Sequence, residues 1–73
     1  MQRYEAKSEI TGSVWKILKA VGDTAEEGDT LMIFESMKME IPLIAEESGT
    51  ITEVRVAEGS PVADGDTVMV IES

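Results

Sequence analysis

The sequence predicts an all-β domain, a small sandwich or barrel built from two copies of one structural unit. Residues 12–36 align without a gap with residues 49–73, at a constant offset of 49 − 12 = 37. Self-similarity at a fixed offset indicates a repeated supersecondary unit. Short segments rich in β-branched residues alternate with closely spaced glycine and proline, which is typical of short strands joined by turns. The best helical pattern, over residues 14–21, is short and ends at a glycine, so it indicates a strand and a turn.

Nine positions are identical in the two copies. They are Gly12, Ala20, Gly22, Gly28, Asp29, Thr30, Met32, Glu35 and Ser36, which recur as Gly49, Ala57, Gly59, Gly65, Asp66, Thr67, Met69, Glu72 and Ser73. Gly22 and Gly28 lie six residues apart, as do their counterparts, and glycine is favoured where a turn requires a positive φ. A phosphate-binding loop is the weaker alternative, because the acidic residues around these turns would repel an anion.

Strands are expected at matching places in the two copies. In the first copy, residues 14–21 supply a strand and a turn, and residues 30–34 supply a further strand. Residues 50–57 and 67–71 are their counterparts in the second copy. The predicted core consists of apolar residues of these segments: Val14, Ile17, Leu31, Ile33, Ile51, Val54, Val68, Val70 and Ile71.

Two further features of the strands bear on packing and on partners. Met32 and Met69 recur at the constant offset and are expected to pack in the core. Trp15 is the only tryptophan of the chain. It is interpreted as a half-buried strand residue, with an anchor for a partner protein as the alternative, because tryptophan is enriched at binding hot spots.

Composition narrows the classes of function. The chain has 73 residues, a formal net charge of −9, and neither cysteine nor histidine. Disulfides, the usual zinc sites and a nucleophile–base pair using Cys or His are therefore excluded, so no catalytic and no metal-binding residue is predicted. Six scattered basic residues argue against nucleic acid. The acidity favours solubility, with steering toward basic partner surfaces as the alternative.

The same totals indicate how the chain is organised. We predict one domain over residues 1–73, with half-repeats of about 1–36 and 38–73. No apolar run is long enough to span a membrane, and the first residues do not resemble a signal peptide. A cytoplasmic protein without membrane contact is therefore expected. No linker-like tract flanks the repeat, which indicates a stand-alone protein or a trimmed domain.

Lys38 stands between Met37 and Met39, where the first copy of the repeat ends and the second begins. In a strand the two methionines would share one face and the lysine would take the other. A hairpin tip normally favours Gly, Asn or Asp. The plain interpretation is two buried methionines beside a solvated lysine, and the functional one is a recognition surface around an exposed amine. By the constant offset the chain ends correspond to this turn, so the lysine is expected to lie far from them.

Residues 35–42, Glu-Ser-Met-Lys-Met-Glu-Ile-Pro, followed by Gly49, resemble the biotinyl/lipoyl attachment domain family. The resemblance covers about residues 6–71 and is nearest to the small stand-alone biotin/lipoyl attachment proteins. It implies a flattened β-barrel or sandwich of two four-stranded antiparallel sheets with quasi-two-fold symmetry. An inserted thumb, present in some biotin carriers, would break the constant offset, so the chain resembles the thumbless members.

The resemblance also implies a cofactor and the residues around it. In this family a biotin protein ligase joins biotin to the lysine through an amide bond, which assigns that role to Lys38. Met-Lys-Met is typical of biotin carriers and Asp-Lys-Ala of lipoyl domains, so Met37 and Met39 are interpreted as recognition residues for biotin attachment. Glu35, Ser36 and Glu40 are candidate ligase contacts. Ser36 replaces the alanine common in biotin carriers, and the stretch before Gly49 departs from the usual Ala-Pro-x-x-Gly.

The implied function is that of a non-catalytic carrier. Its modified lysine would carry carboxybiotin between the biotin carboxylase and carboxyltransferase sites of a carboxylase system, whose subunits are the expected partners. Lipoate on Lys38 stays open, and the chain would then serve a 2-oxo acid dehydrogenase or a glycine-cleavage type system. An unmodified acidic β-domain that acts only as a binding module is a third reading.

Overall fold

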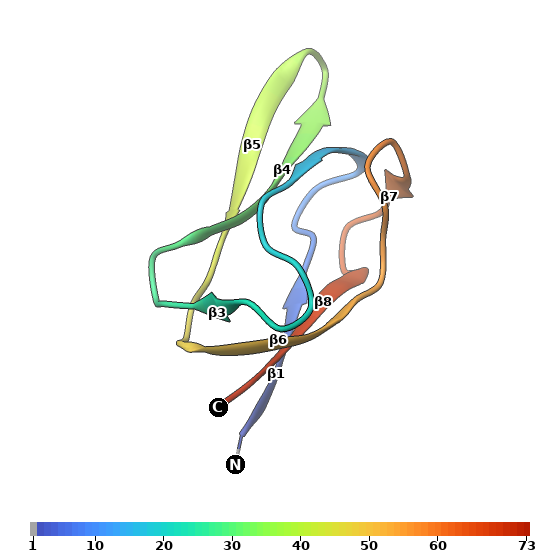
Figure 1. The fold of residues 1–73 in the computed structure, drawn as a ribbon. Helices are drawn as coiled ribbons and strands as arrows, with labels where there is room; N and C mark the ends of the chain where they lie inside the picture. Colours follow the sequence, from blue (N-terminus) through green and yellow to red (C-terminus); the bar gives the residue numbers. More distant parts are fainter. Residues whose placement is uncertain (1) are drawn as a thin grey trace.

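A computed structural model describes residues 2–73, and these residues form eight β-strands (Figure 1). The strands are β1 Arg3–Lys7, β2 Gly12–Ile17, β3 Thr24–Ala25, β4 Thr30–Ser36, β5 Met39–Ile44, β6 Gly49–Val54, β7 Pro61–Val62 and β8 Thr67–Glu72. The described residues contain no helix, as the sequence indicated, and so no helix capable of crossing a membrane. Residue 1, where the predicted domain and its first half-repeat begin, lies outside the described residues.

The strands form two four-stranded antiparallel sheets. One sheet has the order β1-β8-β6-β3 and the other the order β5-β4-β2-β7. A shift of 37 residues carries β1 onto β5, β8 onto β4, β6 onto β2 and β3 onto β7, so each strand of one sheet has a counterpart in the other. The predicted quasi-two-fold sandwich of two antiparallel sheets is therefore confirmed. We call the sheet that contains β1 the terminal sheet and the sheet that contains β5 the lysine sheet.

The core lies between the two sheets, and its largest contributions come from the central strands β4 and β8. The buried residues include Val14, Leu31, Met32, Phe34, Ile51, Val68, Met69 and Ile71. Leu31 and Val68 are each an extra residue in the register, because Thr30 and Met32 oppose consecutive residues of β5 and Thr67 and Met69 oppose consecutive residues of β1. These bulges interrupt the strict alternation of faces, so the consecutive residues Leu31 and Met32 are both buried in β4, and Val68 and Met69 are both buried in β8.

Three predicted core residues are only half-buried. Ile17 and Val54 pack against the edge of the core. Ile33 pairs with Lys16 and Pro42 and therefore shares the outer face of the lysine sheet with them. Val70 is fully buried, but it pairs with acidic residues on the outer face of the terminal sheet. Several smaller residues complete the interior without having been predicted: Ala6, Ala25, Ala45 and Val62.

The recurring glycines of the loops serve the backbone. Gly22, Gly28, Gly59 and Gly65 have φ values between 88° and 94°, a region that glycine enters without steric cost. The conformational interpretation of their spacing is therefore confirmed. Pro42, in contrast, marks no turn and lies inside β5. An edge strand tolerates proline because one side of it has no ladder to donate to.

The chain ends complete the symmetry of the fold. Gln2 and Ser73 exchange two backbone hydrogen bonds of 3.2 and 2.9 Å, at the positions that correspond to Ser36 and Met39 beside the Lys38 turn. The ends of the chain thus form an open counterpart of the β4–β5 hairpin. Figure 1 shows that hairpin at one extremity of the elongated molecule and both termini at the other, as expected from the offset.

The close approach of β6 to β8 leads to a stability prediction. A Cβ atom added at Gly49 would lie 2.7 Å from the carbonyl oxygen of Glu72 and 2.7 Å from Cγ2 of Ile71. We expect Gly49→Ala to lower the free energy of unfolding by about 1–3 kcal/mol, since the crowded atoms belong to the backbone and the core. Urea unfolding followed by circular dichroism measures the change. Glu47→Ala, at an exposed loop position, should stay within about 0.5 kcal/mol, and equal midpoints for both variants would contradict the prediction.

Candidate functional site

The β4–β5 hairpin closes with a two-residue turn made of Met37 and Lys38, and Ser36 pairs with Met39 beneath it. Both turn residues have positive φ, 52° for Met37 and 64° for Lys38. Such a turn matches the twist of the strands but normally carries Asn-Gly. A non-glycine residue in the left-handed region costs about 1–2 kcal/mol. The residue types at this turn therefore oppose the turn itself, which indicates that they are present for another purpose.

The side chains at the hairpin tip are directed to solvent. Met37 is 91% exposed and Met39 is 61% exposed, and Lys38 is also exposed. The interpretation of two buried methionines beside a lysine is therefore wrong. The expected alternation of faces does not apply through the triplet either, because Met37 and Lys38 are turn residues and not strand residues. The tip presents an amine flanked by two uncovered apolar side chains.

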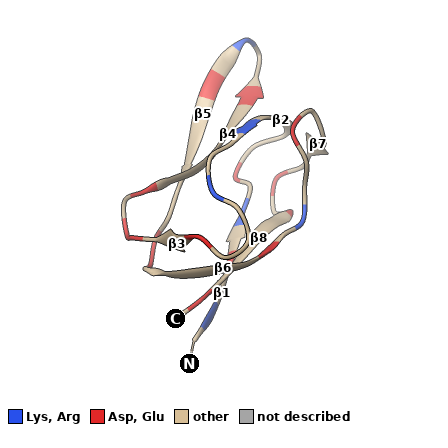
Figure 2. Cartoon of the chain, viewed as in Figure 1, with Lys and Arg blue, Asp and Glu red and all other residues tan. Residues whose placement is uncertain are grey.

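Two carboxylates face each other at the base of the tip. Glu35 and Glu40 form the next cross-strand pair after Ser36 and Met39, and both are exposed. Figure 2 shows acidic segments on both strands of the hairpin and a basic segment at its tip. Like charges placed directly opposite one another destabilise a strand pair. This pair is therefore a second feature of the hairpin that stability alone does not favour.

Ser36 fastens the base of the hairpin to the rest of the domain. Its hydroxyl donates a 3.0 Å hydrogen bond to the carbonyl oxygen of Thr11, in the loop between β1 and β2. The neighbouring Gly12 passes so close that a Cβ atom there would overlap the carbonyl oxygen of Glu35. The hairpin thus protrudes from an anchored base. The sequence carried no signal for Thr11, because the contact joins residues 25 positions apart.

The fold brings together the six residues predicted for the site because they occupy one hairpin. Within residues 2–73, no group of three or more acidic side chains could hold a metal ion.

A cavity of 390 Å³ opens elsewhere, between β1 and β5, and its lining includes Tyr4, Phe34, Ile41 and Leu43 but none of residues 35–40. Burial raises the pKa of Tyr4 at its wall. The hairpin tip can therefore present a group to solvent and hold it in position.

Comparison with known proteins shows which family the sequence matches. Residues 5–71 match the family described as Biotin-requiring enzyme. Among curated proteins, the chain is 45% identical over 40 residues to the Biotin/lipoyl attachment protein of Bacillus subtilis. It is 49% identical over 41 residues to a Biotinylated protein TB7.3 homolog of Mycolicibacterium smegmatis. These alignments cover 55% and 56% of the chain, and only 55% and 58% of the relatives' own lengths.

Solved structures extend the similarity to the whole fold. The urea carboxylase of Kluyveromyces lactis superposes with a TM-score of 0.91 at 39% identity, over 99% of this chain and 6% of that one. A single-chain, multi-domain long-chain acyl-CoA carboxylase superposes with a TM-score of 0.87 at 26% identity, over 93% of this chain and 7% of that one. The chain therefore corresponds to one small part of each of these large enzymes.

The unfavourable turn gives a prediction about stability. Replacing Met37 by Asn should raise the free energy of unfolding by about 1 kcal/mol, because asparagine enters the left-handed region at lower cost than methionine. Thermal unfolding monitored by circular dichroism measures the difference. Met39→Asn, at the first position of β5, is the matched control and should bring no gain. A Met37→Asn protein that melts at or below the wild-type temperature would show that the turn carries no relievable strain.

Proposed function

Because the chain belongs to the family of biotin-requiring enzyme domains matched over residues 5–71, we propose that it is a biotin carrier whose Lys38 holds the cofactor in an amide bond. The observation that supports this most directly is the exposed, strained turn that holds Lys38 at an extremity of the molecule. An amine at that place is open to a ligase and has solvent on most sides. The residues present therefore fit a covalently attached arm.

Attachment would change only the tip of the domain. A biotin protein ligase would present biotin as biotinyl-adenylate. The amide bond between Nζ of Lys38 and the carboxyl carbon of biotin would form as the bond from that carbon to the phosphate oxygen of AMP breaks. AMP would leave, and two protons of the ammonium group would pass to the ligase or to solvent. The amine would lose its positive charge, so the net charge would pass from −9 to −9 − 1 = −10. Met37 and Met39 supply uncovered apolar surface on which the ligase can recognise the turn. Glu35, Ser36 and Glu40 lie directly beneath it as further contacts.

The role of the carrier is transport between enzymes. Bound biotin supplies the ring that accepts and releases a carboxyl group, while the protein supplies position and reach. In the proposed cycle the arm meets a biotin carboxylase and then a carboxyltransferase, and the carrier itself catalyses neither step. The similarity to parts of a urea carboxylase and of an acyl-CoA carboxylase supports partners of this kind. We place these steps in the cytoplasm as part of the same proposal.

Lipoate is the second candidate cofactor, and one relative is named for both groups. The Met37 side chain argues for biotin, because lipoyl domains of the family typically carry an aspartate at that position. An unmodified binding module is the remaining alternative, and it requires Lys38 to stay a free amine in cells. The biotin carrier, the lipoyl carrier and the unmodified binding module differ in the mass of the protein.

The first functional prediction concerns the modified residue. Intact-mass measurement of protein from cells supplied with biotin and lipoate should show one biotin increment, which fragmentation places on Lys38. Lys38→Arg should remove the increment completely and leave the circular dichroism spectrum unchanged, because the side chain is exposed. A lipoyl increment would transfer the chain to the lipoyl carriers. An unmodified mass after incubation with the ligase of the same organism would favour the binding module.

The second functional prediction concerns the flanking methionines. Changing Met37 to Asp and Met39 to Ala should lower kcat/KM for biotinylation by purified ligase about tenfold, a loss of ~1.4 kcal/mol in transition-state binding. Ile44→Ala removes another exposed apolar side chain of β5, farther from the turn, and should leave the rate unchanged. Identical ligase kinetics in all three proteins would rule out a recognition role for the methionines.

A further inference from the structure

The quasi-two-fold symmetry provides an internal comparison between the outer faces of the two sheets. Each position on one face has a counterpart 37 residues away on the other. Two corresponding positions that serve only the fold can carry side chains of the same kind. A position whose side chain differs in kind between the two faces is therefore a candidate for a role other than folding.

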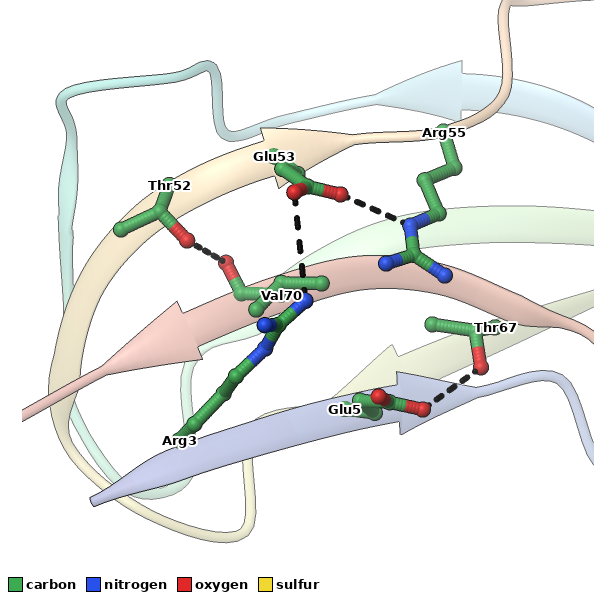
Figure 3. A network of polar contacts seen from close by, with 7 residues as sticks. All are labelled: Arg3, Glu5, Thr52, Glu53, Arg55, Thr67 and Val70. Atoms are coloured by element: carbon green, nitrogen blue, oxygen red, sulfur yellow. Dashed lines mark hydrogen bonds and ion pairs between the residues drawn. The ribbon is translucent and has the colours of Figure 1, made fainter.

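The outer face of the terminal sheet, which we call the terminal face, carries charged side chains that pair with one another. Glu53 accepts a 2.8 Å hydrogen bond from Nε of Arg55 and lies 3.9 Å from the guanidinium of Arg3 (Figure 3). The bond and charge of Arg55 lower the pKa of Glu53. Glu53 also pairs across the sheet with Val70, which is 0% exposed. At the end of this face Arg3 pairs with Glu72, so opposite charges face each other. The carboxylate of Glu53 thus has two basic partners within the same face.

On the outer face of the lysine sheet, which we call the lysine face, the positions that correspond to Glu53 and Arg55 form no ion pair within residues 2–73. Lys16 stands at the position of Glu53 and Leu18 at the position of Arg55, and Leu18 is 49% exposed. Ile33, the counterpart of Val70, is only half-buried. Trp15 is the extra residue of a bulge, is 41% exposed, and has the ammonium of Lys16 5.3 Å from its ring centroid. An apolar patch of Trp15, Leu18 and Ile33 therefore lies where the terminal face has an ion-paired network.

The charges beside this patch are also unsatisfied. The counterpart of the Arg3–Glu72 pair is the pair of Glu40 with Glu35, two carboxylates in direct opposition. Within residues 2–73, the ion pairs involve Arg3, Lys19 and Arg55, and none includes either carboxylate. The lysine face therefore combines an uncovered apolar patch with a pair of like charges that a basic group would relieve.

We propose that the outer face of the lysine sheet is the surface on which a biotin carboxylase docks while it receives the arm of Lys38. The docking surface of that partner would be apolar where it covers Trp15 and Leu18, and it would place an Arg or Lys side chain against Glu35 and Glu40. This inference rests on the proposed function, since it assigns the contact of the loaded carrier. Charge complementarity indicates a basic group on the partner, because the carrier has a net charge of −9 and the opposed carboxylates of Glu35 and Glu40 lie on this face.

The position of the patch favours the carboxylase over the ligase. A ligase reacts at Nζ of Lys38 and so must hold the tip of the hairpin itself. A carboxylase reacts with a ring at the end of the extended arm, and it can receive the arm in a pocket while it rests on the body of the domain. Trp15 lies beside Phe34 and Ile33 in the register, set back from the turn by three or more residues of β4, about 10 Å at 3.3 Å per residue. The patch is thus placed to contact an enzyme that takes up the arm.

The test uses the carrier biotinylated on Lys38, with biotin carboxylase purified from the same organism, ATP and bicarbonate. Carboxylation is measured as a function of carrier concentration for Trp15→Thr and Leu18→Ala. The matched controls are Thr52→Ser and Arg55→Ala, at the corresponding positions of the terminal face. We expect KM for the carrier to rise about tenfold or more in each lysine-face variant, as for truncated hot spots, with kcat unchanged. The controls should retain the wild-type KM.

A third variant tests the charge pair. Glu40→Arg recreates the opposite-charge arrangement of Arg3 and Glu72 and should raise KM by removing the acidic pair that the partner engages. The salt dependence of KM should become weaker in this variant, which a purely structural effect would not produce. Unchanged salt dependence together with unchanged KM would overturn the electrostatic part of the proposal.

The outcomes separate this inference from the proposed function. If Lys38 is not biotinylated, or the biotinylated wild type is not carboxylated, the proposed function fails and the docking inference falls with it. If the wild type is a saturable substrate and KM is unchanged in Trp15→Thr and Leu18→Ala, the docking inference alone is wrong. A slower ligase step with normal carboxylation would assign the face to the ligase and overturn the proposal. Should Trp15→Thr fail to fold, Leu18→Ala decides by the same criteria.

Discussion

The structure depends on a core that neither half of the chain can close by itself. A domain of 73 residues buries only roughly 60% of its unfolded surface, and this chain has no disulfide to compensate. The apolar residues of β4 need those of β8 across the sandwich, and each unit of the repeat buries its apolar side against the other. The bulges at Leu31 and Val68 increase what each central strand contributes. Both halves of the chain are therefore needed to form the core.

This shared core allows the hairpin to carry unfavourable features. Left-handed Met37 and Lys38 and the opposed carboxylates of Glu35 and Glu40 all cost stability. They are held by the β4–β5 pairing and by the bond from Ser36 to Thr11. At the other end of the molecule, the corresponding place is occupied by the paired chain ends, which bear no such strain on a closed turn. One fold thus supports two chemically different extremities.

The same contrast extends to the sheet faces. The terminal face protects Val70 with a network of exposed charges, which individually contribute little to stability but shield the apolar side chain from water. The lysine face leaves Trp15 and Leu18 uncovered. The opposed carboxylates of the hairpin and the exposed apolar side chains of Trp15 and Leu18 thus lie on the same sheet.

The sequence by itself determined the class of fold, the positions of the turns and the residue at the tip. These follow from local signals: glycine at positive φ, β-branched runs, and a constant offset that places Lys38 opposite the chain ends. The sequence also predicted most of the buried core, including Val14, Leu31 and Ile51. Only the tertiary structure decided the faces of the residues beyond each bulge, because a bulge changes the face of every residue that follows it. Ile33 and Val70 lie on outer faces for that reason. The opposition of Glu35 and Glu40 follows from the register of β4 and β5, which the turn at Met37 and Lys38 sets. The hydrogen bond from Ser36 to Thr11 and the exposed apolar residues of the lysine face depend on the pairing of segments far apart in the sequence, which local patterns do not encode.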